Sequence, residues 1–265
     1  MGRVEVRKTY KLYVGGAFPR SESGRSYEVR GDDGNFLANA VRASRKDIRD
    51  AVVAAGKAST KWGGATAFNR GQILYRIAEM MESRRADLVD AVGLAEGSRG
   101  ARSQVDEAID LWVWYAGWAD KLAQVMGSLN PVAGPYFNLT APEAIGIAGV
   151  VASETPSLLG ITRRLAPALC GGNVVVAIAS EAHPLPAIEL SECMATADVP
   201  GGVVNILTGL KSELVPVLAS HLDIDALDLD RGDADLERAA ADNVKRVVRA
   251  RGDAQSPYEI SAFLE

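Results

Sequence analysis

The chain has 265 residues, of which 48% are hydrophobic and 24% charged, a balance typical of a soluble globular protein. Its formal net charge of −5 argues against the basic surface that nucleic acids and anionic membranes require. Its only cysteines, Cys170 and Cys193, lie in apolar helical patterns, which argues against a disulfide framework. The N-terminus has no apolar signal segment, and the longest apolar run, 144–152, is far shorter than the roughly 20 residues that cross a bilayer. We therefore expect a cytoplasmic protein.

The N-terminal region predicts an extended segment followed by a helix. Residues 10–14 and 26–29 have strand-like patterns, and a Gly15-Gly16 turn lies between them, so we expect a hairpin. Ser44 and Asp47 predict a helix start, because the hydroxyl accepts from a free backbone N–H and the carboxylate favours the positive end of the helix.

Two longer helices are predicted next, over 68–94 and 102–122. The second carries large aromatic side chains at helical spacing, which favours a place in the core or in an interface (Trp112, Trp114, Tyr115, Trp118). Residues 127–142 then lose the helical period and contain several Pro and Gly residues, a composition typical of a projecting extended arm.

From residue 145 onward, short apolar strands alternate with helices. The predicted strands are 145–151, 174–179, 203–207, 224–229 and 244–249, and the predicted helices are 157–170, 184–197, 211–220 and 233–242. This alternation indicates parallel strands joined by crossovers, with helices on both faces of the sheet. The sequence therefore predicts an α/β fold, namely a doubly wound, parallel, Rossmann-like sheet with a helical N-terminal part and a projecting β arm.

Four short segments, taken in order and spacing, resemble the aldehyde dehydrogenase superfamily. They are residues 115–122, 142–156, 165–173 and 201–209. The resemblance implies one NAD-binding domain over residues 1–265, together with the arm that this family uses for oligomerisation. The family's next domain normally carries the catalytic cysteine, and because the chain ends at Glu265 we expect that domain to be absent. The chain particularly resembles the degenerate second unit of two-unit members of the superfamily.

The resemblance also implies catalytic positions, and these hold other residue types here. Neither Cys170 nor Cys193 lies where the family places its thiolate nucleophile, and both patterns are typical of small buried hydrophobic residues. Glu154 lies nearest the position of the family's oxyanion-binding asparagine, and an ionised carboxylate cannot donate a hydrogen bond. Ala250 matches the general-base glutamate and has no titratable group. We therefore expect no catalytic residues in this chain.

The cofactor positions implied by the resemblance are partly retained. The family's ribose-binding Lys-Pro-Ser-Glu-like sequence is matched by Ile178 to Glu181, so the lysine is lost while Ser180 and Glu181 remain. The loop at 229–233 contains two aspartates, which would repel a pyrophosphate at the following helix start. Ser180, Glu181 and Gly209 are thus the candidate, vestigial cofactor-binding residues.

The metal-ligand pattern is weak, because His183 and His221 have no second ligand pattern near either of them, and we expect no metal site. Charged residues near the predicted strand ends favour a surface adapted to water (Arg163, Arg164, Asp228, Asp230, Arg231).

We interpret the chain as a pseudoenzyme, a non-catalytic subunit that assembles with itself or with an active aldehyde dehydrogenase. The alternative is an NAD(P)-dependent oxidoreductase that oxidises aldehydes to acids and is completed by a partner or by a further C-terminal portion. A third hypothesis is a dinucleotide-binding module without chemistry. The first hypothesis implies no bound cofactor, and the other two imply NAD or NADP. Under all three hypotheses we expect neither a nucleic acid nor a membrane as a partner.

Overall fold

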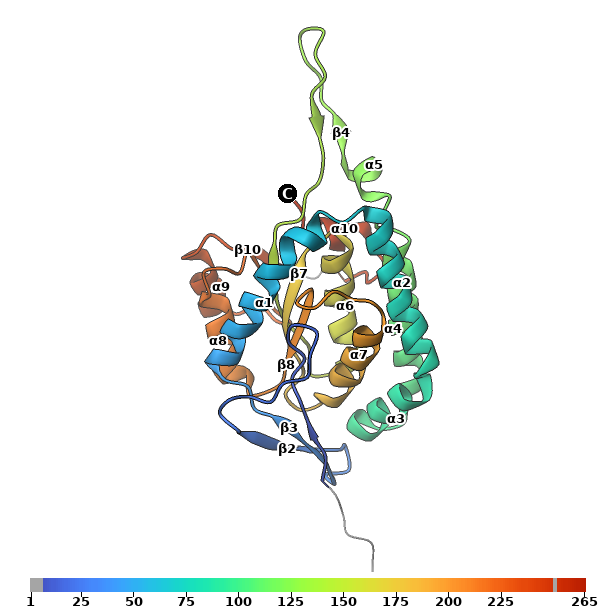
Figure 1. Cartoon of the computed structure of the whole chain (residues 1–265), viewed down its shortest axis with the longest axis vertical. Helices are drawn as coiled ribbons and strands as arrows, with labels where there is room; N and C mark the ends of the chain where they lie inside the picture. Colours follow the sequence, from blue (N-terminus) through green and yellow to red (C-terminus); the bar gives the residue numbers. More distant parts are fainter. Residues whose placement is uncertain (1–6, 250–251) are drawn as a thin grey trace, which may run out of the picture.

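The computed structural model describes residues 7–249 and 252–265, and its centre is a parallel five-stranded sheet (Figure 1). The strands lie in the order β10-β9-β6-β7-β8. Their bounds are Ile147–Val151 (β6), Val174–Ile178 (β7), Val204–Leu207 (β8), Ala226–Asp228 (β9) and Arg246–Val248 (β10). Every residue of β6 to β9 is buried, as a sheet covered on both faces requires. The predicted fold class is confirmed.

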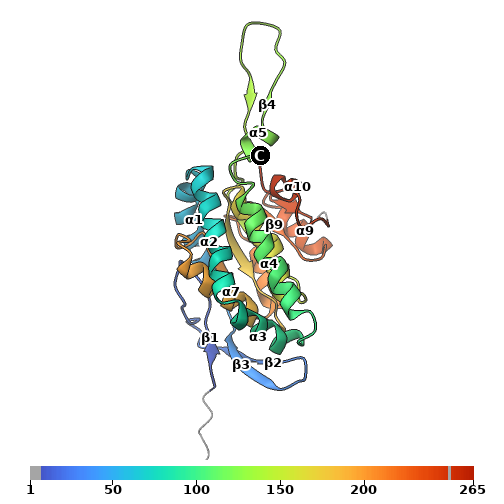
Figure 2. The ribbon, with the colours of Figure 1, turned by 90° about the vertical axis from the view of Figure 1, so that its right-hand side faces the viewer.

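Helices cover both faces of this sheet. One face carries α6 (Ser157–Cys170) and α7 (Leu185–Thr196), and the other carries α1 (Arg45–Gly63) and α8 (Lys211–Ser220). Outside α6 and α7 lies a further layer of α2 (Ala67–Ser83), α3 (Arg85–Glu96) and α4 (Ala101–Ala116) (Figure 2). Two short helices, α9 (Ala234–Ala241) and α10 (Pro257–Ser261), lie beside β10 and α6 respectively.

The predicted helix starts and lengths are largely confirmed. Asp47 closes the first turn of α1, because its carboxylate accepts from the Ser44 backbone N–H at 2.7 Å and from the Ser44 hydroxyl at 2.8 Å. The single helix predicted over 68–94 is instead two helices. Arg84 ends α2 and begins α3, and its guanidinium is paired with Glu189 and Glu192 of α7, which holds the bend.

The helix predicted over 102–122 ends early, at Ala116, where Gly117 caps it, and a separate helix, α5, covers Leu122–Met126. Trp112 and Tyr115 are fully buried, whereas Trp114 and Trp118 are partly buried against the same core. The expectation that these aromatic residues belong to the core is confirmed.

The predicted N-terminal hairpin is wrong in its pairing. The antiparallel pair is β2 (Ser26–Arg30) with β3 (Phe36–Val41), and β1 (Thr9–Tyr10) lies parallel to β3. The Gly15-Gly16 turn is local, bringing Val14 against Ala17. Tyr13 pairs with Ile206 at the edge of the central sheet, with backbone hydrogen bonds of 2.9 and 2.7 Å. The first segment therefore covers the free edge of β8 and has no strand partner within 26–29.

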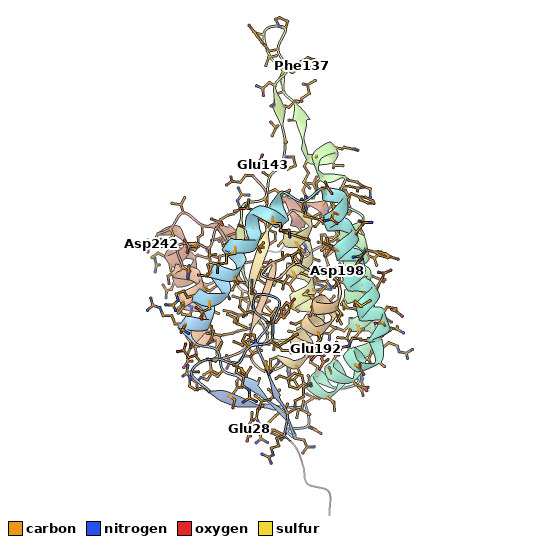
Figure 3. The ribbon with its side chains drawn as sticks, in the orientation of Figure 1. Glu28, Phe137, Glu143, Glu192, Asp198 and Asp242 are labelled. Atoms are coloured by element: carbon orange, nitrogen blue, oxygen red, sulfur yellow. The ribbon has the colours of Figure 1, made fainter. Side chains whose placement is uncertain are left out.

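The arm predicted over 127–142 projects from the body of the protein (Figures 1 and 2). Its base is a short antiparallel pair of β4 (Ser128–Leu129) and β5 (Leu139–Thr140). The Asn130 amide ties the two sides together, because it donates to the Asn138 and Thr140 side chains at 3.1 and 2.8 Å. Phe137 lies near the tip (Figure 3).

A buried asparagine joins three segments of the core. The Asn173 amide nitrogen donates to Ala168 at 3.1 Å and to Phe263 at 2.9 Å, and its oxygen accepts from Gly146 at 3.0 Å. These bonds connect the end of α6, the start of β6 and the segment after α10. Each buried polar atom of this side chain thus has a partner.

We expect Asn173→Ala to lower the free energy of unfolding by about 3 kcal/mol, because three buried groups lose their partners. Urea denaturation measures the change. Asn243→Ala is the control, since that amide makes one solvent-exposed bond to Ser220 at 3.2 Å, and it should cost less than about 0.5 kcal/mol. Equal costs for the two variants would contradict the role given to Asn173.

Candidate functional site

The order of the strands defines a switch point at the carboxyl edge of the sheet. From β6 the chain proceeds to β7 and β8 on one side, and then returns to β9 and β10 on the other. Ligands of doubly wound sheets bind outside the carboxyl ends of the strands at such a point. A cleft of about 600 Å³ lies here, between the segment that follows β6, the start of α8 and the loop 229–236.

The structure brings Ser180, Glu181 and Gly209 to this edge of the sheet. Glu181 accepts from the backbone N–H of Lys211 at 2.7 Å, two residues beyond Gly209. Tyr27 donates its hydroxyl to the Glu181 carbonyl at 3.3 Å. Burial raises the pKa of Tyr27, and the nearby Glu181 and Glu154 carboxylates raise it further. The three candidate positions are therefore spatial neighbours, held by internal contacts.

Gly209 has a structural reason to be glycine. Its φ of +148° is a conformation that side chains rarely adopt, and a Cβ there would lie 3.0 Å from the backbone nitrogen of Ala43. Ala43 in turn donates to the carbonyl of Thr208 at 2.9 Å. The backbone at Thr208 and Gly209 thus approaches the backbone at Ala43 closely. This approach is a sufficient reason for glycine at position 209, and contact with a ligand is not needed to explain it.

Glu154 is the centre of a hydrogen-bond network in the turn after β6. Its Oε2 accepts from the Ser180 hydroxyl at 2.8 Å and from the Ala182 backbone N–H at 3.0 Å, and its Oε1 is paired with the Lys211 ammonium group. Partial burial raises the pKa of Glu154, but the donors Ala182, Lys211 and Ser180 outweigh it and lower the pKa below its ordinary value. Glu154 is therefore held as a carboxylate.

Lys211 is a site residue that the sequence analysis missed. Ile178, which matches the family's lysine, is fully buried in β7. The ammonium group at this edge comes from α8 instead, and it donates to the Ala152 carbonyl as well as pairing with Glu154. The sequence did contain a signal for this residue. Lys211 follows Gly209 by two positions, just after a predicted strand, and the carboxyl ends of β6, β7 and β8 meet at one edge of the sheet, so a lysine there is expected near the cleft.

The N-termini of α6 and α9 at this edge are capped by side chains of the chain itself, whereas α7 has no side-chain cap. Glu96 accepts from the Ser157 N–H of α6 at 2.7 Å, and Gln104 accepts from the next two N–H groups at 2.9 and 3.2 Å. Asp233 accepts from the first N–H groups of α9 at 2.9 and 3.1 Å. Because free N–H groups give a helix start its affinity for anions, this capping removes it.

A second cavity, of about 240 Å³, adjoins the cleft and is lined by charged residues. Arg164 is buried there and paired with Asp228, and it also contacts Asp230 at 3.3 Å. Burial raises the pKa of Asp228, while Arg164 opposes that rise. The expectation that these charges form a water-adapted surface is wrong for Arg164 and Asp228, because the two neutralise each other inside the protein.

Both thiols are buried. Cys170 donates to the Tyr115 carbonyl at 3.2 Å, and burial raises its pKa to about 12. Burial likewise raises the pKa of Cys193 to about 11. The nucleophilic form of cysteine is the thiolate, so neither group is activated at neutral pH. The interpretation of both as buried hydrophobic residues is confirmed.

The predicted general-base position, Ala250, lies outside the residues that the structure describes. Over 7–249 and 252–265, no three His, Cys, Asp or Glu side chains gather in a group that could ligate a metal ion. Within the same ranges, no helix has both the length and the apolar character needed to cross a bilayer.

Proteins of known structure share this fold. The model of the aldehyde dehydrogenase family matches residues 20–254. The chain belongs to the aldehyde dehydrogenase family. Mouse retinal dehydrogenase 2 is 34% identical over 98% of this chain, and cytosolic 10-formyltetrahydrofolate dehydrogenase of Pongo abelii is 31% identical over 97%. The crystal structure of HpcC from Thermus thermophilus superposes on 91% of the chain with a TM-score of 0.86 and 29% identity.

The chain spans only part of these aldehyde dehydrogenase relatives. It covers 51% of the retinal dehydrogenase, 30% of the formyltetrahydrofolate dehydrogenase and 48% of HpcC. The part that matches contains the five-stranded sheet and the cleft at its carboxyl edge.

We expect a pH-dependent contribution of Glu154 to stability. Because its pKa is lower in the folded protein than in the unfolded chain, the stabilisation is present above about pH 4.5 and is lost as the pH falls through the folded-state pKa. Relative to Glu154→Gln, the native protein should gain about 1 kcal/mol at pH 7, a value reduced for the partial exposure of the group. Denaturation at pH 7 and pH 3.5 tests this, and an unchanged difference would contradict it.

Proposed function

We propose that this part of the chain acts as a non-catalytic subunit of the aldehyde dehydrogenase family, which assembles with itself or with an active aldehyde dehydrogenase. One observation carries the proposal. At the edge where the fold would place a cofactor, the loop before α9 is acidic, its Asp233 carboxylate accepts from N–H groups in the first turn of α9, and Glu181 accepts from the backbone N–H of Lys211.

The residues of the cleft do not fit a dinucleotide. A pyrophosphate needs free N–H groups or cations, and the first N–H groups of α9 are bound to the Asp233 carboxylate. Asp230 and Asp235 line the same cleft and would repel a phosphate. Arg231 is the counter-charge in that loop, and the acidic groups outnumber it. We therefore derive no hydride-transfer step for this chain.

The residues described also provide no group for covalent catalysis by thiolate. Both thiols are buried and protonated at neutral pH. Glu154 is ionised and accepts hydrogen bonds, so it cannot act as the donor to a developing oxyanion. These features support a role in assembly instead of chemistry.

The arm supports assembly because it exposes apolar side chains that a monomer would leave in water. Phe137, near the tip, is 89% exposed (Figure 3). Tyr136 is 76% and Leu139 71% exposed, and Leu129 is exposed beside Leu139 at the base of the arm. A contiguous exposed apolar surface marks an interaction site. The two arm strands also leave their outer backbone edges free to pair with another strand.

The alternative function is an NAD(P)-dependent oxidation of aldehydes to acids, completed by a partner or by a further C-terminal portion. The observation that favours it is Lys211, which brings an ammonium group to the edge where Ile178 provides none, beside a cleft of about 600 Å³. Binding of NAD⁺ would distinguish this function from the first.

We expect no saturable heat when NAD⁺ or NADP⁺ is titrated into the protein by calorimetry at up to millimolar concentration. The reason is that the acidic loop and the capped helix starts leave no place for the pyrophosphate. An active NAD-dependent aldehyde dehydrogenase, titrated in the same buffer, is the positive control. Saturable binding to this chain would favour the alternative function.

We expect Phe137→Asp to weaken self-association at least tenfold, because a charge at the arm tip opposes burial of the apolar surface. Analytical ultracentrifugation over a range of concentrations measures the effect. Leu222→Asp is the matched control, since Leu222 is 77% exposed but lies beyond α8, far along the chain from the arm. Identical association of both variants and the native protein would contradict the role of the arm.

A further inference from the structure

The donors around Glu154 form a cradle for a carboxylate group. A backbone N–H (Ala182), a hydroxyl (Ser180) and an ammonium group (Lys211) converge on the two oxygens of one side chain. This combination of charge and directed donors gives strong hydrogen bonds to an anion. In this structure the anion is part of the chain itself.

The donors are fixed more firmly than the carboxylate they hold. Ser180 is 1% exposed, and its hydroxyl oxygen also accepts from the His183 N–H at 2.8 Å. Lys211 is fixed at both ends, because its backbone N–H donates to Glu181 and its ammonium group to the Ala152 carbonyl. The Glu154 side chain is 44% exposed and lies in the turn between β6 and α6. Rotation of this side chain into solvent would leave the donors in place.

We propose that Lys211, Ser180 and the Ala182 N–H form a binding site for small carboxylate compounds, which Glu154 occupies when no ligand is bound. The adjoining cleft contains both Glu154 and Lys211 in its lining and has room for the remainder of such a molecule. This ligand differs from the dinucleotide of the alternative function, and its binding does not depend on whether the chain assembles.

The charge of the cleft selects a singly charged, planar anion. One oxygen of Glu154 meets Lys211, and the other meets Ser180 and Ala182, which is the geometry of a carboxylate. Asp230, Asp233 and Asp235 lie in the same cleft and disfavour a doubly charged phosphate more than a monocarboxylate. Formate and acetate are therefore the matching probes.

The test is chemical rescue of Glu154→Ala. Its thermal unfolding is followed in sodium formate, acetate or phosphate, with sodium chloride at the same ionic strength as the reference. Glu154→Ala should unfold at a lower temperature than the native protein. Formate or acetate should raise its Tm saturably, by about 3 °C at ten times the dissociation constant. The native protein should respond at least tenfold more weakly, because its own carboxylate competes.

Glu213→Ala is the matched control. Glu213 lies two residues after Lys211 and is paired with Arg42 and, at 3.7 Å, with Arg25. Its side chain is 38% exposed, close to the exposure of Glu154. Both arginine side chains are partly exposed, at 30% and 46%, so water screens their attraction for an added anion, and carboxylates should rescue this variant less than they rescue Glu154→Ala. Adding Lys211→Met to Glu154→Ala should abolish the rescue, because the cation of the cradle is lost.

Three results would overturn the proposal: no saturable rise in Tm of Glu154→Ala with formate or acetate, an equal rise in Glu213→Ala, or a larger rise with phosphate than with acetate. If Glu154→Ala does not fold, Glu154→Gln serves instead. It keeps the size of the side chain, and acetate should raise its Tm at lower concentrations than it does for the native protein. Equal acetate dependence of Glu154→Gln and the native protein would likewise overturn the proposal.

Discussion

The backbone donors at the carboxyl edge of the parallel sheet impose the main constraint on this structure. Every helix that begins there has N–H groups without partners inside the helix, and each must find an acceptor. In a dinucleotide-binding member of such a fold, phosphate and ribose oxygens can supply some of these acceptors. Here Glu96, Glu181 and Asp233 supply acceptors to α6, α8 and α9 respectively, and Glu154 accepts from the loop before α7. These acceptors satisfy backbone donors at this edge from within the chain.

Lys211 of α8 brings an ammonium group to the carboxyl edge of the sheet, near the end of β7 where Ile178 is buried. β7 places Ile178 inside the sheet, where a lysine would have to be desolvated, whereas α8 begins at the same edge and offers a position with partial access to water. The ammonium group then balances Glu154 and ties the turn after β6 to α8. The pair lines the cleft, and its Glu154 carboxylate, at 44% exposure, has more access to water than the Lys211 ammonium group.

The arm is the part of the fold through which we propose that the chain assembles. Its base is stabilised by backbone pairing and by the Asn130 amide, yet its apolar side chains face water, in contrast to the fully buried strands of the central sheet. Such a segment gains little from folding against its own body, and this is the reason for proposing that its apolar residues contact another chain. The cleft and the arm lie on separate parts of the molecule, and the two proposed roles are independent.

The sequence by itself determined the elements and the class of the fold. Short continuous apolar runs correctly placed the five strands, because burial on both sheet faces demands them, and period-3.6 patterns correctly placed the helices 157–170 and 211–220. Candidate residues Ser180, Glu181 and Gly209 were also found at one edge. Only the tertiary structure decided which distant residues pair with one another. Residue 13 pairs with residue 206, Glu96 reaches a helix 61 residues away, and Glu154 meets Lys211, contacts that no local pattern records. Local periodicity reports which side of an element is buried, whereas the acceptor that satisfies a given donor depends on how distant elements pack.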